Sequence, residues 1–188
     1  MNLAQVPNVI SACRLLAVPV LLFAAVEGRP RLFAWLLLLS LLSDIVDGVV
    51  ARRYHLESTL GAILDTTADF LLTVMAAIGM FTLQPAFVSA HAAQLLLLLG
   101  LYVGEVLISL ARYRRLSSFH TYADRVCAYA QGIFFVGLFF WGYTPWLFYT
   151  AWIAGCLAYI EEWALLALLP EWTHDVRGIY WVLKARRT

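Results

Sequence analysis

Long apolar runs separated by charged residues, proline or glycine follow one another along the chain. Most of these runs approach or exceed the roughly 20 residues that a helix needs to cross a bilayer. The pattern predicts six membrane-spanning helices, over residues 14–26, 32–51, 60–82, 86–111, 122–143 and 146–169. A membrane barrel would need alternating apolar and polar positions, which the sequence lacks, so we expect an all-α polytopic membrane protein.

The two ends of the chain differ from the runs between them. Residues 1–13 carry Pro7 and Asn8, and we predict an N-terminal interfacial helix there. An amino-terminal extension of the first span explains the same residues equally well. The tail from Pro170 onward, with two tryptophans and several basic residues, is predicted to be an interfacial segment.

Composition supports a membrane protein built as one domain over residues 1–188. Of the 188 residues, 63% are hydrophobic and 13% are charged, which is far from the balance of soluble domains. The net charge of +1 argues against a nucleic-acid partner. The three cysteines lie far apart in apolar sequence and do not suggest a disulfide framework.

Basic residues concentrate on one predicted side of the membrane. They follow the second, fourth and sixth spans, and only Arg29 and Arg31 lie on the other side. The positive-inside rule therefore places both termini in the cytoplasm. Gly100 and Gly104 form a G-x-x-x-G helix-packing motif in the fourth span, which fits either a homodimer contact or packing within the chain.

Acidic residues inside the predicted spans are the most informative feature of the sequence, because each costs about 2.5 to 3.5 kcal/mol at the centre of a bilayer on insertion scales. Asp44 and Asp47 are three residues apart at the cytoplasmic end of the second span, and Asp65 and Asp69 are four apart at the start of the third. Each pair shares a helix face. The two faces are expected to converge just below the cytoplasmic surface.

Four converging carboxylates repel each other unless cations neutralise them, and an all-oxygen ligand set selects Mg²⁺, Mn²⁺ or Ca²⁺. We therefore predict a metal site with two ions. Gly48 and Gly61 lie one turn from the aspartates and leave space beside them, and Arg52 is placed to bind a phosphate oxygen. Pairing with Arg52 and Arg53 is a weaker explanation, since two arginines do not offset four acids.

These residues carry a resemblance to a known family. The stretch from Asp44 to Asp69 has the pattern D-x-x-D-G-x-x-A-R-x8-G-x-x-x-D-x-x-x-D, which resembles the signature of the CDP-alcohol phosphotransferases. Pro7, Asn8, Ser11 and Arg14 are similar to the P-N-x-x-[TS]-x-x-R element that precedes it in that family. The resemblance covers the first 70 or so residues specifically and the rest by topology.

The resemblance implies transfer of a phosphatidyl group from CDP-diacylglycerol to the hydroxyl of a small polar alcohol, with release of CMP. It assigns one Mg²⁺ or Mn²⁺ to Asp44, Asp47 and Asp65, and a second to Asp44, Asp65 and Asp69. Asp69 is also the implied general base. Substrate-binding roles fall to Asn8, Gly48, Ala51, Arg52 and Gly61. A homodimer in a bacterial inner membrane, with its active site facing the cytoplasm, is the implied setting.

The basic residues around the fourth-to-fifth loop are the evidence for which alcohol is the acceptor. Arg112 and Arg125 are the predicted contacts to a phosphate on the acceptor, and short members of the family suggest glycerol 3-phosphate. The segment Phe119–Tyr122 lacks the lysine typical of phosphatidylglycerophosphate synthases, so inositol phosphate, inositol and serine stay open. Glu105, Glu161 and Glu162 are expected to pair with arginines or to line a polar cavity.

Two alternatives from other classes follow from the same acids. UbiA-type prenyltransferases also use paired aspartates with Mg²⁺ and a diphosphate donor, but in a longer bundle. A cation transporter would place carboxylates along a path across the bilayer. The single cluster at one level of the membrane, with Gly48, Arg52 and Gly61 at fixed offsets, favours the phosphotransferase.

Overall fold

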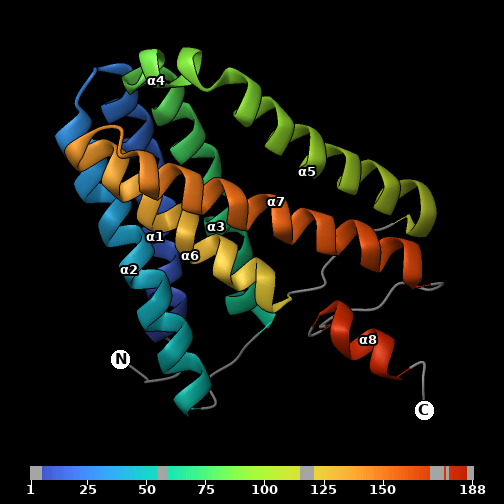
Figure 1. Ribbon diagram of the computed structural model, residues 1–188. Coiled ribbons are helices and arrows are strands. Elements are labelled where there is room, and N and C mark those ends of the chain that lie inside the picture. Colours follow the sequence, from blue (N-terminus) through green and yellow to red (C-terminus); the bar gives the residue numbers. More distant parts are fainter. Residues whose placement is uncertain (1–5, 55–58, 115–120, 170–175, 177, 186–188) are drawn as a thin grey trace. The chain divides into compact units, whose positions relative to one another are not determined.

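The computed structural model describes residues 6–54, 59–114, 121–169, 176 and 178–185, with side chains for all of these except 6–8, 47–54, 59–60, 62–63, 65–66 and 185. All of the secondary structure in these stretches is helical, which confirms the predicted all-α class (Figure 1). The helices are α1 (Val6–Val26), α2 (Pro30–Tyr54), α3 (Thr59–Leu83), α4 (Pro85–Ala90), α5 (Ala92–Tyr113), α6 (Tyr122–Trp141), α7 (Pro145–Leu168) and α8 (Ile179–Ala185).

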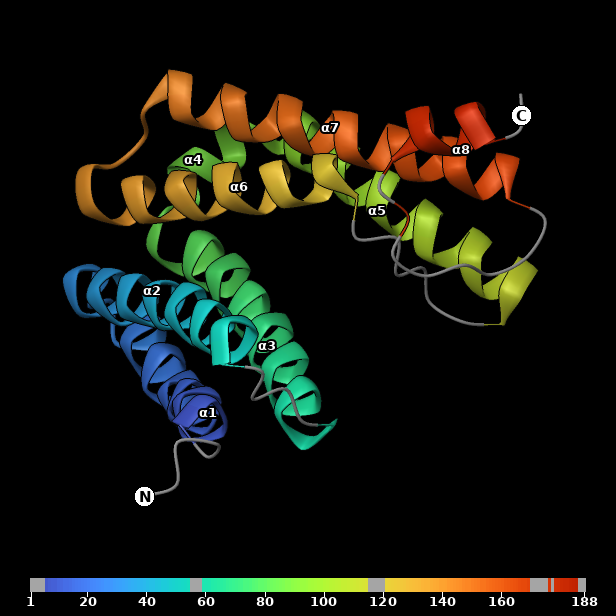
Figure 2. The same cartoon turned by 90° about the horizontal axis from the view of Figure 1, so that it is seen from below.

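The chain forms two compact units, each with its own packing. The first consists of Met1–Ala90 with Leu138–Gly142, and the second of His91–Gly137 with Tyr143–Thr188. In the first unit, α1 packs against both α2 and α3, and the three helices lie side by side in the two ribbon views (Figures 1 and 2). In the second unit, α5 packs along α7.

Small residues let the helices of the first unit approach closely. Gly79 on α3 faces the ring of Phe33 on α2 so tightly that an added Cβ atom would lie 2.4 Å from the ring's Cζ atom. The Phe33 ring is fully buried and meets the edge of Phe139 with 4.7 Å between ring centroids. Gly79 is therefore a packing requirement of this core.

In the second unit, tryptophans of α7 bind backbone carbonyls of α5. Trp163 Nε1 donates to the carbonyl oxygen of Leu101 at 3.0 Å, and Trp152 Nε1 donates to that of Gln94 at 3.0 Å. A Cβ atom on Gly104 would lie 2.6 Å from the Trp163 ring, whereas one on Gly100 would meet nothing within 4 Å. Of the two glycines of the G-x-x-x-G motif, Gly104 is thus used for packing within the chain.

Within the described residues, four helices are long and apolar enough to cross a membrane. They are Val9–Val26 of α1, and α5, α6 and α7, while α3 contributes the shorter apolar stretch Thr67–Leu83. These four correspond to the first, fourth, fifth and sixth predicted spans. The second and third predicted spans are helical but are not among the candidates, and the predicted site aspartates lie on these two helices.

The structure differs from the predicted pattern at two helix boundaries. Residues 6–26 form one continuous helix, which agrees with an extension of the first span and not with a separate interfacial helix. The predicted fourth span is divided at His91, so that α4 and α5 are separate. His91 is buried there, and its Nε2 atom lies 3.0 Å from the Tyr143 hydroxyl, so a polar contact within the second unit marks the break.

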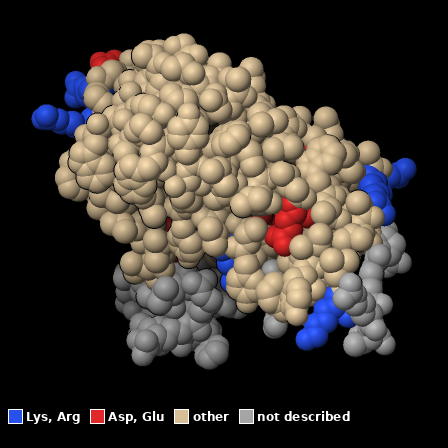
Figure 3. Space-filling view, viewed as in Figure 1, with Lys and Arg blue, Asp and Glu red and all other residues tan. Residues whose placement is uncertain are grey.

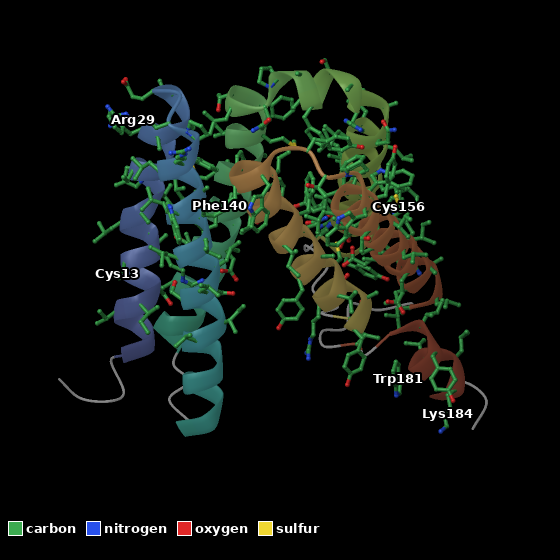
Figure 4. All side chains as sticks on the ribbon, turned by 60° about the vertical axis from the view of Figure 1, so that its left-hand side comes forward. Cys13, Arg29, Phe140, Cys156, Trp181 and Lys184 are labelled. Carbon is green, nitrogen blue, oxygen red and sulfur yellow. The ribbon has the colours of Figure 1, made fainter. Side chains whose placement is uncertain are left out.

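The surface is consistent with a lipid environment. Charged side chains are few on the face of the molecule shown in Figure 3. Large apolar side chains are exposed on several long helices, among them Leu16 on α1 and Leu96 on α5, at 72% and 66%. Trp181 and Lys184 project from the short helix α8, as an interfacial segment requires (Figure 4).

The contact between Gly79 and Phe33 generates a prediction about stability. Gly79→Ala should lower the free energy of unfolding by about 1 to 3 kcal/mol, because the added methyl group would overlap the fully buried ring of Phe33. Thermal unfolding of the detergent-purified protein measures the effect. Gly100→Ala is the matched control, and should leave stability unchanged or slightly higher because alanine favours the helix. Equal melting temperatures for the two variants would show that the contact is not tight.

Candidate functional site

One arginine brings together aspartates from two helices. The Nη1 atom of Arg14 on α1 donates to Oδ1 of Asp44 on α2 and to Oδ1 of Asp69 on α3, the latter at 2.8 Å. Its Nη2 atom donates to Oγ of Ser11 at 3.3 Å. Side chains of α1, α2 and α3 therefore meet at a single guanidinium group.

This site is buried on the side of the arginine and open on the side of the acids. The Arg14 side chain is 2% exposed, whereas those of Asp44 and Asp69 are 35% and 50% exposed. A buried charge is tolerated when it is paired and hydrogen-bonded, and two carboxylates meet this need. The exposed carboxylate of Asp69 is accessible to a ligand.

Helix geometry explains why these positions meet. Ser11 and Arg14 are three residues apart on α1 and share a face. Helices α2 and α3 run without interruption through the aspartate positions, so 44 and 47 lie one turn apart, as do 65 and 69. Because α1 packs on both α2 and α3, the face of α1 that carries Arg14 reaches both acidic helices.

The remaining predicted residues of this site are placed less completely. Gly61 is half-buried on α3, one turn before position 65. The side chains of the other residues lie outside those that the structure describes, although all of them belong to α1, α2 or α3: Asn8, Asp47, Gly48, Ala51, Arg52 and Asp65. Their predicted roles stay predictions.

The two described aspartates suit a hard cation. A positively charged nitrogen already lies against an oxygen of each, so the pair is arranged to bind positive charge. Carboxylate oxygens are the ligands that Mg²⁺ and Mn²⁺ prefer. Among the residues with described side chains, no group of three or more His, Cys, Asp or Glu is placed to hold a metal ion. The two further predicted ligands, Asp47 and Asp65, are not in that set.

Arg112, predicted to contact the acceptor, holds the end of a helix. Its Nη1 atom donates to the carbonyl oxygen of Leu166 at 2.6 Å, and the neighbouring Tyr113 hydroxyl donates to that of Leu169 at 2.6 Å. Carbonyls in the last turn of a helix lack partners within the helix, so α5 caps the end of α7. This contact is structural, and the predicted role in acceptor binding is not tested by it.

Arg125, the other predicted acceptor contact, is exposed on the first turn of α6, and its guanidinium lies 5.6 Å from the centre of the Tyr122 ring.

The neighbouring residue Asp124 caps the start of α6. The backbone N–H of Thr121 donates to Asp124 Oδ2 at 2.8 Å, and the N–H of Asp124 donates to the Thr121 hydroxyl at 3.2 Å. This reciprocal pair is a capping arrangement, which explains Asp124 without a ligand.

The three glutamates of the long apolar helices have different surroundings. Oε1 of Glu161 on α7 accepts the backbone N–H of Ile179 at 2.9 Å and so holds the start of α8. Glu105 on α5 is 2% exposed, and Glu162 is half-buried. The sequence predicts that these acids pair with arginines or line a polar cavity, whereas Glu161 binds the N-terminus of α8, where a negative charge is favourable.

Arg14 as the direct partner of Asp44 and Asp69 was not predicted from the sequence. The signal was present, since a charged residue inside the first apolar run is costly and requires a partner. The spacing of Ser11 and Arg14 was noted only as part of the amino-terminal element. Which acids the arginine would meet depends on how α1 packs, and this is not encoded in local spacing.

Comparison with known proteins identifies the family. Residues 4–169 match the profile of the family described as CDP-alcohol phosphatidyltransferase. Because the match covers most of the chain, the protein belongs to the CDP-alcohol phosphatidyltransferase family. Together with its long apolar helices, this makes the chain an integral membrane protein. It also favours the CDP-alcohol phosphatidyltransferase family over the prenyltransferase and transporter alternatives.

Individual relatives differ in the acceptor that their names imply. Over 108 residues the chain is 33% identical to a cardiolipin synthase (CMP-forming) of Streptomyces coelicolor, covering 51% of this chain and 50% of the relative. Over 64 residues it is 39% identical to a CDP-diacylglycerol–inositol 3-phosphatidyltransferase of Saccharomyces cerevisiae, covering 34% and 29%. Over 71 residues it is 36% identical to a CDP-diacylglycerol–glycerol-3-phosphate 3-phosphatidyltransferase of Rickettsia bellii, covering 36% and 39%.

The matches therefore span half or less of the length of these relatives. No solved structure matches the chain. The family is established by these comparisons, and the acceptor is not.

The contact between Glu161 and α8 generates a prediction. Glu161→Ala should speed cleavage by trypsin after Lys184 roughly tenfold, because a hydrogen bond to a charged acceptor that holds α8 is lost. Gel electrophoresis with mass spectrometry of the products measures this rate. Glu161→Gln keeps an acceptor oxygen and should give an intermediate rate, while Glu27→Ala, in the exposed turn after α1, should match the unmodified protein. An unchanged rate for Glu161→Ala would contradict the structural role.

Proposed function

We propose that this protein is a membrane enzyme that transfers a phosphatidyl group from CDP-diacylglycerol to the hydroxyl of a small polar alcohol and releases CMP. The observation that carries the proposal is the convergence of Asp44 and Asp69 on one cationic atom between α2 and α3. These are the first and last aspartates of the spaced pattern, in a chain that belongs to the matching family.

The reaction forms one P–O bond and breaks another. The acceptor oxygen attacks the phosphorus of the phosphatidyl group, and the bond from that phosphorus to the CMP oxygen breaks, so that CMP leaves with the electron pair. Asp69 takes the proton of the acceptor hydroxyl. Its carboxylate is half-exposed, as a base that meets a diffusing acceptor must be. A carboxylate beside cations is a weak base, so its contribution depends on its position.

The other residues of the pattern have proposed roles in holding the donor. Asp44, Asp47 and Asp65 would hold one Mg²⁺ or Mn²⁺ ion, and Asp69 with Asp44 and Asp65 a second. Bound there, the ions would offset negative charge on the reacting phosphate oxygens. Gly48, Ala51 and Gly61 would border the cytidine, Arg52 would bind the diphosphate, and Asn8 would contact the substrate.

The proposed acceptor is glycerol 3-phosphate, with Arg112 and Arg125 as contacts to its phosphate. A Rickettsia bellii relative is named for glycerol 3-phosphate and a yeast relative for inositol, so inositol, inositol phosphate and serine are tested beside it. The Streptomyces relative is a CMP-forming cardiolipin synthase. Phosphatidylglycerol, whose free hydroxyl would accept a second phosphatidyl group to give cardiolipin, therefore belongs in the same test.

We further propose that α2 and α3 also cross the membrane, which gives six spans with both termini in the cytoplasm. Helix α2 is 25 residues long, enough to cross if its aspartates line the site and do not face lipid. The site would then open to the cytoplasm of a bacterial inner membrane. A homodimer is part of this proposal.

The first test is CMP release by the purified protein from CDP-diacylglycerol with Mg²⁺ and each acceptor in turn. Asp69→Asn should lower the rate with the preferred acceptor at least about 100-fold, because the proton of the hydroxyl loses its base. Glu27→Gln removes an exposed acid from the turn after α1 and should leave the rate unchanged. Release that is independent of acceptor, or equal in the two variants, would contradict the proposed role of Asp69.

Removal of divalent cations gives a second prediction. The metal chelator EDTA should reduce CMP release to background, and Mg²⁺ or Mn²⁺ should restore it, because like-charged phosphates and carboxylates otherwise repel each other. Adding the ion back at about 100 times its dissociation constant should also increase the free energy of unfolding by about 2.7 kcal/mol. This gain is measured as a rise in melting temperature. Full activity in EDTA would exclude a metal-dependent site.

A further inference from the structure

We propose that Arg14 is an internal counter-ion that occupies the place of a divalent cation between Asp44 and Asp69, and that its Nη1 atom has to leave these carboxylates when a cation binds. The inference rests on the metal site in the proposed function. It concerns a positioning residue that sets the concentration of metal needed to fill the site. Arg14 is not itself a ligand of the metal.

The geometry makes the two occupants mutually exclusive. A single nitrogen, Arg14 Nη1, binds Oδ1 of Asp44 and Oδ1 of Asp69. A cation coordinated by these same oxygens would lie about 2.0 to 2.6 Å from each, which is shorter than a charge-assisted hydrogen bond. The guanidinium and the ion would therefore fill the same space between the two helices.

The surroundings of Arg14 show why it stays at the site. Its side chain is 2% exposed, so the charge would be poorly solvated without a partner. The carboxylates of Asp44 and Asp69 supply that partner when no ion is bound. Nη2 is held separately by the hydroxyl of Ser11, on the same helix. A shift of Nη1 away from the acids therefore leaves the arginine anchored on α1.

Competition between Arg14 and a cation for the two carboxylates changes the apparent affinity for metal, which can be measured. Binding of an ion has to break the hydrogen bonds from Nη1 to the two carboxylates, so Arg14 weakens the apparent affinity for metal. The loss of even one charge-assisted hydrogen bond corresponds to roughly tenfold in an equilibrium constant. Arg14 also stabilises the metal-free protein, because without it Asp44 and Asp69 repel each other.

The experiment titrates the detergent-purified full chain with Mn²⁺ alone, and measures free Mn²⁺ by electron paramagnetic resonance. Arg14→Gln should bind Mn²⁺ at least about tenfold more tightly than the unmodified protein. In EDTA its melting temperature should be lower, and the rise in melting temperature on adding Mn²⁺ should be larger. A residue with a merely structural role would lower stability in both conditions and leave the affinity unchanged or weaker.

Two further variants make the result specific. Arg29→Gln removes the same charge from the turn between α1 and α2 and should leave the affinity unchanged (Figure 4). Arg14→Lys keeps a positive charge but lacks the planar fork that binds the acids and Ser11 together. Its affinity should lie between those of the unmodified protein and Arg14→Gln. If Arg14→Gln does not fold, tighter binding by Arg14→Lys supports the proposal, and equal or weaker binding overturns it.

The outcomes separate this inference from the proposed function. Mn²⁺ binding that is equal or weaker in Arg14→Gln, with metal-dependent CMP release intact in the unmodified protein, would overturn the inference alone. If neither protein binds Mn²⁺ and CMP release does not need metal, the metal site itself is absent, and the inference falls with it.

Discussion

The organisation of the first unit depends on the charge of Arg14. A guanidinium group at 2% exposure in a helix core has to be paired, and the pairing requires α2 and α3 to present Asp44 and Asp69 to the same face of α1. Removing either acid would leave the buried guanidinium with one carboxylate fewer, at a cost that the exposure of the acids reduces. The close contact of Phe33 on α2 with Gly79 on α3 fixes how these two helices meet in the apolar part of the unit. The ion pairs of Arg14 join both helices to α1 and gather the acids.

Much of this arrangement could be predicted from spacing alone. The apolar runs predicted helices close to those observed, and the interval of three or four residues within each aspartate pair predicted a shared face. Spacing does not determine which helix supplies the counter-charge, because that depends on packing between helices distant in sequence. For the same reason the sequence does not assign Arg14 to the aspartates, although a charged residue inside an apolar run requires a partner. The division at His91 was missed because the sequence around it, although it includes Ser89 and Gln94, has no proline or glycine between residues 86 and 99 that would predict a break. A hydrogen bond between His91 and Tyr143 lies at the boundary.

The second unit shows how charged or small residues can have structural roles that a pattern cannot distinguish from functional ones. Gly104 lies against Trp163 of the same chain, so the G-x-x-x-G motif does not by itself indicate a dimer. Arg112 caps α7, Asp124 starts α6 and Glu161 holds α8. Helix ends carry unpaired backbone groups in every membrane bundle, and they attract charged side chains to the levels where substrates also bind. Charge near a membrane surface is therefore weaker evidence for a site than charge on two converging helix faces.

A site made of like charges needs a counter-ion whether or not a metal is bound. Repulsion between the acids would otherwise drive the helices apart or protonate a carboxylate. An arginine on the adjoining helix answers this requirement independently of the ion concentration, and it does so with one positive charge where a divalent cation brings two. The second charge makes the carboxylates bind a divalent cation more strongly than the guanidinium. The hydrogen bonds that the guanidinium donates to the carboxylates reduce this difference in affinity. In the proposed metal site, the balance between stability without metal and affinity for metal would then be set by one side chain of α1, Arg14, which lies outside the aspartate pattern.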